Sequence, residues 1–230
     1  MQRIVILLSL SLLLLANNVH ADVTAQDIAE AYGINNWGDI VELRFTFNVK
    51  TPDREVHRHW TWRPHDDRIT LETEGEEPIT YSRSLLADNT PPAIISADKR
   101  FINDSYWFLF PFQIVWSNPT VTDAGKAGLP IGEGQARKVI VQYPDEGGYT
   151  PGDAYDLYLN HQHHIVQWVF RRGGGENGRA MTWENVVECG PIKVCTDHYN
   201  ADRTFRLWFS GVSVVTKGGD TFSLPDPVQN

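Results

Sequence analysis

Cysteine is scarce in this chain, which holds only Cys189 and Cys195 among its 230 residues. Two cysteines exclude the class of small scaffold that several disulfides hold together. Five residues separate them, so they do not form the Cys-X-X-Cys motif of thiol oxidoreductases, and zinc would need more ligands than the nearby His198. Because the chain begins with an export-type segment, described below, we predict a disulfide between Cys189 and Cys195 across a hairpin.

Motifs of the common enzyme classes are also lacking. The chain contains no G-x-S-x-G nucleophile elbow, no P-loop and no H-E-x-x-H zinc motif. The acidic pairs Asp66-Asp67 and Glu76-Glu77 fall in predicted turns, where carboxylates are common. We therefore expect a protein that is not an enzyme and needs no cofactor. A catalytic site assembled from distant residues is the alternative.

Histidines occur in two groups, at positions 57 and 59 and at positions 161, 163 and 164. Alternate positions on a strand share a face, which is the spacing that a pair of metal ligands needs. The second group lies in a predicted turn among solvated residues. We interpret both groups as surface histidines and expect no metal site.

Basic residues are outnumbered, with 20 Lys and Arg against 29 Asp and Glu and a formal net charge of −9. Neutralising phosphates requires clustered Lys and Arg, so this acidic balance argues against a nucleic-acid partner. Beyond the N-terminus, no apolar run approaches the roughly 20 residues that span a bilayer. We therefore expect no transmembrane segment in the mature chain.

The N-terminus has the pattern of a cleavable signal peptide. Arg3 supplies a basic start, positions 4–16 are apolar, and Val19-His20-Ala21 places small residues at the cleavage spacing. We predict a signal peptide over residues 1–21, a mature start at Asp22 and a periplasmic or secreted location. Residues 22–230 then have the size of a single domain.

Aromatic residues are concentrated at positions 98–116. Helical spacing there separates an apolar stripe from a polar one. The apolar stripe consists of Phe101, Ile102, Phe108, Leu109 and Phe112, and the polar one of Lys99, Arg100, Asn103 and Asp104. Ser96 is the expected N-cap of this helix, and Pro111 is expected to end it near Phe110.

Alternating hydrophobicity predicts strands through most of the remaining chain. Between positions 41 and 49 every odd residue is apolar and every even residue is polar, which is typical of an antiparallel strand with one buried face. A short helix is expected at 24–32, capped by Thr24 and ended by Gly33, and residues 117–134 are expected to be irregular. With nine or ten strands in total, we predict a mainly β (α+β) fold. It is a single curved antiparallel sheet that forms an unclosed half-barrel, with one or two helices on its concave face.

The order of these elements and two short stretches resemble a known family. YDLYLNHQHHIVQWVFR, at 155–171, is similar to a hairpin of the periplasmic lipoprotein-carrier superfamily (LolA/LolB-like), and FLFPFQIVWSNP, at 108–119, resembles uncharacterised members of the same group. The resemblance implies a half-barrel with helices over its concave face, and the binding of acyl chains or another hydrophobic ligand. The cysteine pair departs from that pattern, and no residue matches a partner-docking site.

Eight aromatic residues are candidates for lining an apolar groove. They are Trp60, Trp62, Phe101, Trp107, Phe108, Phe112, Trp116 and Trp168. Large aromatic side chains suit a pocket for an alkyl chain. The alternative is that they fill a closed core.

We therefore hypothesise an exported protein that binds or carries a hydrophobic, lipid-like ligand. One alternative is an envelope interaction protein with a closed core and an envelope protein partner, and another is a hydrolase of lipid-like substrates. Arg171, Arg172 and Arg179 flank three consecutive glycines and form a local cationic cluster. We interpret this cluster either as a docking loop for an acidic partner or headgroup, or as a solvated hairpin tip.

Overall fold

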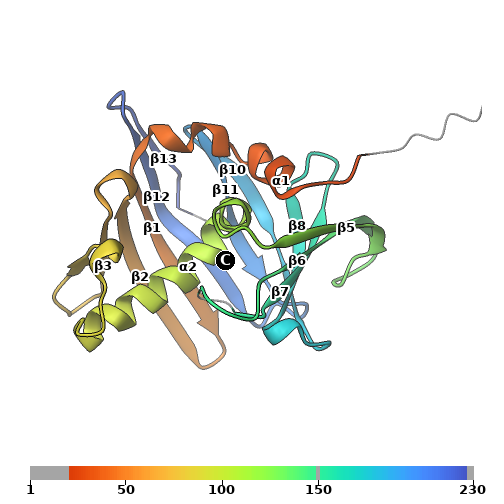
Figure 1. Cartoon of the computed structure of the whole chain (residues 1–230), viewed down its shortest axis with the longest axis horizontal. Coiled ribbons are helices and arrows are strands. Elements are labelled where there is room, and N and C mark those ends of the chain that lie inside the picture. Colours follow the sequence, from red (N-terminus) through yellow and green to blue (C-terminus); the bar gives the residue numbers. More distant parts are fainter. Residues whose placement is uncertain (1–20, 149–150, 227–230) are drawn as a thin grey trace, which may run out of the picture.

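The strands form two antiparallel sheets (Figure 1). The computed structural model describes residues 21–148 and 151–226, so the predicted signal peptide lies outside the described residues apart from Ala21. The larger sheet consists, in spatial order, of β10 (Glu184–Cys189), β11 (Ile192–Tyr199), β12 (Arg206–Thr216), β1 (Ile40–Thr51), β2 (Arg54–Arg63), β3 (Arg68–Glu72) and β4 (Ile79–Tyr81), with β13 (Thr221–Ser223) paired to β12. The smaller sheet consists of β5 (Thr120–Gly128), β6 (Gln135–Gln142), β7 (Ala154–Leu159), β8 (Ile165–Arg171) and β9 (Arg179–Thr182).

The two sheets meet where β9 leads into β10. The backbone N–H of Trp183 donates to the carbonyl of Val166 at 2.9 Å, and the N–H of Tyr199 donates to the hydroxyl of Thr182 at 3.0 Å. β4 ends the larger sheet, β5 ends the smaller one, and no ladder joins these two strands in the described part of the chain. The predicted mainly β, unclosed half-barrel is thus confirmed. It is built from two antiparallel sheets, where the sequence predicted a single one.

The long helix α2 (Pro92–Trp116) lies across the face of the larger sheet and reaches the smaller one (Figure 1). It begins earlier than expected, because Pro91 and Pro92 supply the N-terminus in place of Ser96. It also continues through Pro111, which was expected to end it. The missing N–H and the ring of Pro111 instead kink the helix, and Leu109 takes the non-helical angles φ −121° and ψ 24°.

The short helix α1 (Ala25–Ala31) forms as the sequence predicts. The Thr24 hydroxyl accepts from the Asp27 N–H, and the Asp27 carboxylate accepts from the Thr24 N–H, which makes a capping box. Gly33 follows at φ +93°, a left-handed conformation that ends the helix. The 3-10 helices are η1 (Ile34–Asp39), η2 (Pro64–Asp66), η3 (Arg83–Leu85) and η4 (Arg172–Gly174).

The segment expected to be irregular contains strand β5. Its residues from Asp123 to Gly128 have low strand propensity, and Gly125, at φ +73°, lies at a register shift in its pairing with β6. The ladder to β6 nevertheless extends from Thr120 to Gly128. Hydrogen bonding to β6 therefore makes this segment a strand, although the local propensity of its residues does not predict one.

The predicted disulfide is wrong, because both cysteines are free thiols. In the β10–β11 hairpin Cys189 lies opposite Ile192, and Cys195 lies opposite Val186. The cysteines are therefore three residues out of register, about 10 Å along the strands. That offset exceeds the Cα separation of roughly 4.4–6.8 Å that a disulfide spans.

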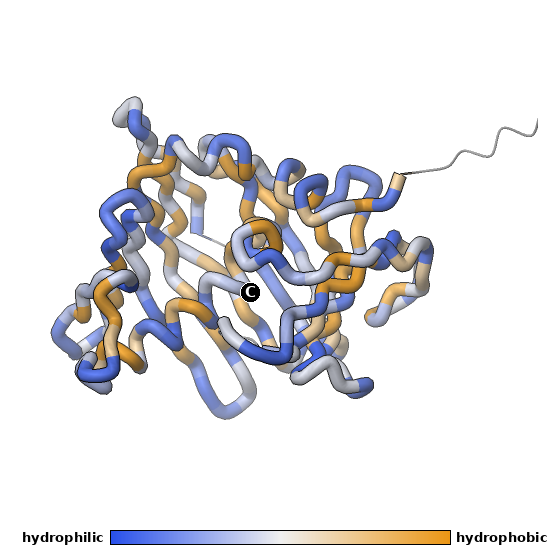
Figure 2. The backbone as a smooth tube through the Cα atoms, in the orientation of Figure 1, coloured by the Kyte–Doolittle hydropathy of each residue, from blue (hydrophilic) through white to orange (hydrophobic). Residues whose placement is uncertain are grey.

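The core lies between α2 and the sheets, and hydrophobic and hydrophilic stretches alternate along the chain that encloses it (Figure 2). The ring of Phe108 lies 4.6 Å from that of Phe45 and 4.6 Å from that of Phe209, both on the larger sheet. The ring of Phe110 instead contacts Trp168 of the smaller sheet, at 5.0 Å. No helix within 21–148 and 151–226 is long and apolar enough to cross a membrane.

Candidate functional site

One face of α2 borders a large cavity. The side chains on this face are Lys99, Ile102, Asn103, Tyr106 and Trp107. They follow the i, i+3, i+4, i+7, i+8 spacing of a single helical face. This face contains Lys99 and Asn103, which the sequence placed on the polar side of the helix. Lys99 and Asn103 therefore lie at the rim of the cavity, whereas the other two residues of the polar stripe, Arg100 and Asp104, do not line it.

Aromatic side chains of the smaller sheet form the opposite wall. Tyr155 of β7 lies directly across from Phe170 of β8, and their rings are 5.2 Å apart. The Trp168 ring lies 5.0 Å from that of Tyr155 and 4.6 Å from that of Trp107. Met181 of β9 pairs with Trp168 and extends the apolar wall.

The loop between β11 and β12 closes the third side with Asn200, Ala201, Asp202 and Phe205. The enclosed volume is about 1050 Å³. That is at the upper end of the roughly 300–1,000 Å³ usual for small-molecule sites. The cavity opens to solvent, because several of its lining residues at the rim are exposed: Lys99, Asn103, Arg172, Arg179 and Asp202.

Three cations stand at this rim on separate elements: Lys99 on α2, Arg172 on η4 and Arg179 on β9. None of them forms an ion pair in the described part of the chain. The two rim carboxylates already have other donors. Asp153 accepts from the N–H of Gly173 at 2.8 Å, and Asp202 accepts from the N–H and hydroxyl of Thr204 at 3.1 and 2.7 Å. The rim cations are therefore available to an anionic group.

The phenol of Tyr155 stays neutral in this site. Burial first, and then the nearby charge of Asp153, raise the pKa of Tyr155 well above its ordinary value. The wall therefore offers a hydroxyl and aromatic surface but no charge of its own. The residues described hold no group of three or more His, Cys, Asp or Glu side chains that could bind a metal ion.

Two of the eight aromatic candidates, Trp107 and Trp168, line this cavity. Phe101 and Phe108 are buried against the larger sheet, where the ring of Phe101 contacts that of Trp60 at 5.3 Å. Trp60 is buried and donates its indole N–H to Asp104 at 2.8 Å. These three side chains belong to the core on the other side of α2.

The remaining candidates, Trp62, Phe112 and Trp116, meet at the C-terminal end of α2 around Trp37. The Trp37 ring lies 4.8 Å from that of Trp116 and 5.3 Å from that of Trp62. Trp116 is 39% exposed, so this aromatic cluster reaches the surface. It does not contribute to the cavity lining.

Several lining residues were not among the sequence candidates: Ile102, Tyr106, Tyr155, Phe170, Met181 and Phe205. The alternation of Tyr155 with Leu157, and of Trp168 with Phe170, indicates an inward face for β7 and β8. It does not indicate which end of each strand meets the cavity. That depends on where α2 crosses the sheets.

No family model matches the chain, and no curated protein matches it in sequence. Solved structures do match. A LolA superfamily protein from Nitrosomonas europaea is 11% identical, with a TM-score of 0.43 over 89% of this chain and 96% of that protein. A DUF1329 family protein from Desulfovibrio piger is 6% identical, with a TM-score of 0.43 over 82% and 90%. A domain described as an outer membrane lipoprotein-sorting protein, from Vibrio parahaemolyticus, is 12% identical, with a TM-score of 0.45 over 84% and 91%.

Proposed function

We propose that the chain binds or carries a hydrophobic ligand with an acyl chain, without covalent chemistry, in the cavity between α2 and the smaller sheet. The proposal rests mainly on one observation, a cavity of about 1050 Å³ whose walls include Trp107, Tyr155, Trp168 and Phe170. Apolar side chains that line an open cavity keep some contact with water, and a hydrophobic ligand gains free energy by removing that contact. In this proposal, residues 22–230 act as one exported domain in the periplasm or outside the cell.

The rim cations narrow the ligand class. Lys99, Arg172 and Arg179 carry charge at the mouth while the interior is apolar. An amphiphile with a carboxylate or phosphate head would place its chain inside and its head among these cations. A fatty acid is the simplest molecule of this form.

The length of the ligand's acyl chain should determine its affinity in a quantitative way. Burial of each methylene contributes about 0.8 kcal/mol, or roughly fourfold in affinity. Affinity should therefore rise with each added methylene until the chain fills the cavity. A plateau beyond that length would measure the usable depth of the cavity.

The test combines native mass spectrometry of the purified protein with uptake of a fluorescent fatty acid. Trp107→Ala removes part of the wall, and Met181→Trp, at the position paired with Trp168, fills the cavity from β9, so both should weaken uptake at least tenfold. Trp116→Ala is the matched control, because Trp116 lies on the same helix outside the cavity. Circular dichroism checks that each variant is folded.

Two results would reject the proposal. Absence of any co-purified lipid together with no fatty-acid uptake would show that the cavity has no such ligand. Uptake that Trp107→Ala and Met181→Trp leave unchanged would place the ligand elsewhere.

The surface cluster of Trp37, Trp62 and Trp116 favours a second candidate, an interaction with another envelope protein. Exposed tryptophans are over-represented at protein interfaces. Under this candidate, Trp116→Ala would abolish capture of the partner and leave fatty-acid uptake intact. The two functions are thus separated by one variant.

A further inference from the structure

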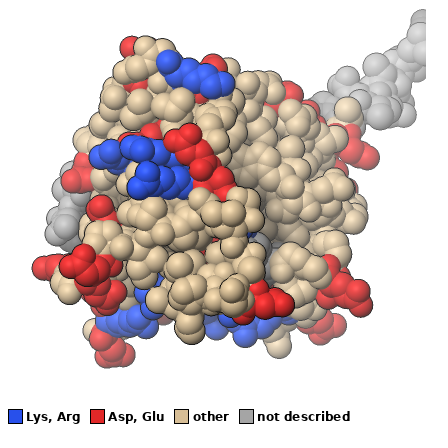
Figure 3. Space-filling model, turned by 60° about the vertical axis from the view of Figure 1, so that its left-hand side comes forward, with Lys and Arg blue, Asp and Glu red and all other residues tan. Residues whose placement is uncertain are grey.

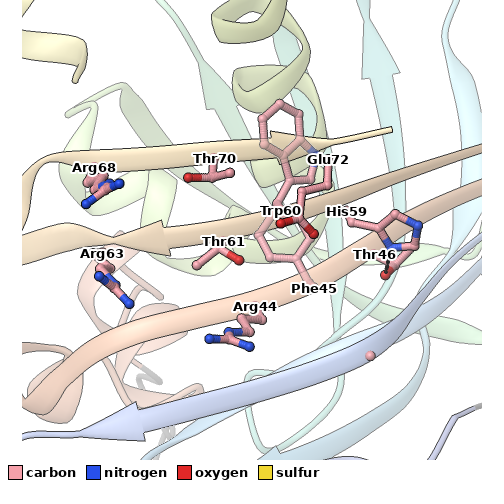
Figure 4. A pocket seen from close by; sticks show the side chains of 11 residues that line it. Arg44, Phe45, Thr46, His59, Trp60, Thr61, Arg63, Arg68, Thr70 and Glu72 are labelled. Carbon is pink, nitrogen blue, oxygen red and sulfur yellow. Dashed lines mark hydrogen bonds between the residues drawn. The ribbon is translucent and has the colours of Figure 1, made fainter. Parts of the chain in front are cut away.

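Three arginines from neighbouring strands line a second, polar pocket on the larger sheet. They are Arg44 of β1, Arg63 of β2 and Arg68 of β3. Figure 4 shows them together at one end of the pocket, with Thr61 and Thr70 beside them and His59 and Glu72 at the other end. The pocket has a volume of about 380 Å³ and shares no lining residue with the apolar cavity.

The strand register brings like charges together. Arg63 pairs directly with Arg68 across β2 and β3. Arg44 pairs with Thr61, two residues before Arg63, so all three arginines share one face of the sheet. Like charges placed directly opposite on neighbouring strands destabilise a sheet. This arrangement costs folding free energy unless something neutralises it.

Only part of this charge is neutralised within the described residues. Glu42 accepts from Arg44 at 2.7 Å and from Arg63 at 2.6 Å, and it is buried. Burial raises the pKa of Glu42, but hydrogen bonds from Arg63 and Arg44 outweigh it and hold the pKa below its ordinary value, so the group stays ionised. Arg68 has no ion pair in the described part of the chain. Two carboxylates are therefore near the three guanidinium groups: Glu42 pairs with Arg44 and Arg63, and Glu72, at the other end of the pocket, forms no ion pair with Arg68.

Threonine hydroxyl groups also line the pocket, and the carboxylate of Glu72 lies at the end away from the arginines. Thr61 and Thr70 lie between the arginines and His59, and the Thr46 hydroxyl lies 2.8 Å from Nδ1 of His59 (Figure 4). On the face shown in Figure 3, Lys and Arg form compact clusters with Asp and Glu beside them. Compact basic clusters of this kind suit a small anion better than an extended polyanion.

We propose that this pocket binds a phosphate group, with Arg44, Arg63 and Arg68 as its ligands. Guanidinium groups form paired, charge-assisted hydrogen bonds with phosphate oxygens. A phosphate carries up to two negative charges and several acceptor oxygens, so it satisfies arginines that approach from three strands. The bound phosphate supplies the negative charge that the Arg63–Arg68 pair lacks.

Titration calorimetry with inorganic phosphate at low ionic strength tests the site. Arg68→Gln removes the arginine without an ion pair and leaves Glu42 and its partners in place, so phosphate affinity should fall at least tenfold. Arg54→Gln, the same change at an exposed position of β2 outside the pocket, should have no effect. Raising the salt concentration should weaken binding to the wild type.

Thermal unfolding adds a readout that separates binding from folding. Without phosphate, Arg68→Gln should raise Tm, because it removes the repulsion from Arg63. With phosphate, the Tm of the wild type should rise and that of Arg68→Gln should not. Equal phosphate affinity in the wild type and Arg68→Gln would overturn the proposal, as would phosphate binding no tighter than chloride.

Two further probes identify the source of the phosphate. Binding of glycerol 3-phosphate without binding to phosphatidic acid vesicles would indicate a small phosphorylated solute. Binding to those vesicles, but not to phosphatidylcholine vesicles, that Arg68→Gln removes would indicate a lipid headgroup. Failure of all three phosphate probes would overturn this site and leave the apolar cavity proposal unaffected.

Discussion

Asp104 of α2 accepts two hydrogen bonds from the guanidinium group of Arg58 on β2, from Nε at 2.7 Å and from Nη2 at 2.6 Å. Asp104 is fully buried, and the indole of Trp60 donates to the same carboxylate. Arg58 also lies over the ring of Phe47, 4.5 Å from its centre. This interaction fastens α2 to the larger sheet one turn before Trp107. It therefore fixes the position of the helical face that borders the cavity.

Breaking this pair should strongly destabilise the fold. Arg58→Met leaves the Asp104 carboxylate buried without its counter-charge, which should cost about 3–5 kcal/mol in the free energy of unfolding. Urea denaturation measures the loss. The control is Arg203→Met, which removes the exposed pair with Glu184 and should cost at most about 1 kcal/mol. Similar losses in the two variants would contradict the assigned role of Asp104.

The sequence could predict the elements that depend on local signals. Helix α1 follows from the cap at Thr24 and the glycine at position 33, and both act as expected. Strand β1 follows from its alternation, with Leu43, Phe45 and Phe47 buried. The aromatic stripe of α2 packs against a curved β surface, as its composition indicates. Residues close together in the sequence are sufficient to specify these features.

Features that depend on distant residues could not be predicted. Asp104 lies on the polar stripe of α2 but is fully buried, because Arg58 comes from a strand 46 positions away. The hairpin register that separates Cys189 from Cys195 is set by strand pairing, not by their spacing in the chain. The rim of the cavity likewise gathers Lys99, Arg172 and Arg179 only when α2 meets the smaller sheet.

His198 should make stability depend on pH. Its ring is fully buried between Trp107 and Trp183, and burial lowers its pKa to about 3. An unfolded histidine, with a pKa of about 6.5, binds a proton that the folded one does not. The neutral ring therefore stabilises the fold fully above pH 6.5. That stabilisation is lost as the pH falls from 6.5 towards 3, by at most about 1.4 kcal/mol per pH unit.

The variant His198→Gln tests this dependence, because glutamine can still donate to the Thr182 carbonyl that lies 3.1 Å from the histidine Nδ1. Urea denaturation at intervals between pH 7 and pH 4 should show a shallower decline for this variant than for the wild type. Carboxylates contribute equally to both proteins, so the difference between the two curves isolates the histidine. Parallel curves would show that His198 takes up its proton without unfolding.

Both thiols should be present and protected in the folded protein. Burial raises the pKa of Cys189 to about 11 and that of Cys195 further, so neither forms the reactive thiolate near neutral pH. Ellman's reagent should react slowly with the native protein and with two thiols after unfolding in guanidinium chloride. Reductant should leave Tm unchanged. A lower Tm in reductant, or no reactive thiol in the unfolded protein, would instead show that Cys189 and Cys195 form a disulfide.

The rim cations should discriminate between ligand headgroups. Lys99, Arg172 and Arg179 are exposed, so each contributes a screened interaction of roughly 0.2–1 kcal/mol, or about 1.4- to fivefold in affinity. The triple change of these residues to glutamine should weaken binding of a fatty acid and leave binding of the alcohol of equal chain length unchanged. High salt should reduce the preference of the wild type for the acid, because the charges are solvated. Arg100→Gln, beside Lys99 in sequence but not part of the cavity lining, is the matched control. Equal loss for acid and alcohol would mean that the substitutions damaged the apolar cavity, and equal affinity in all variants would place the headgroup away from this rim.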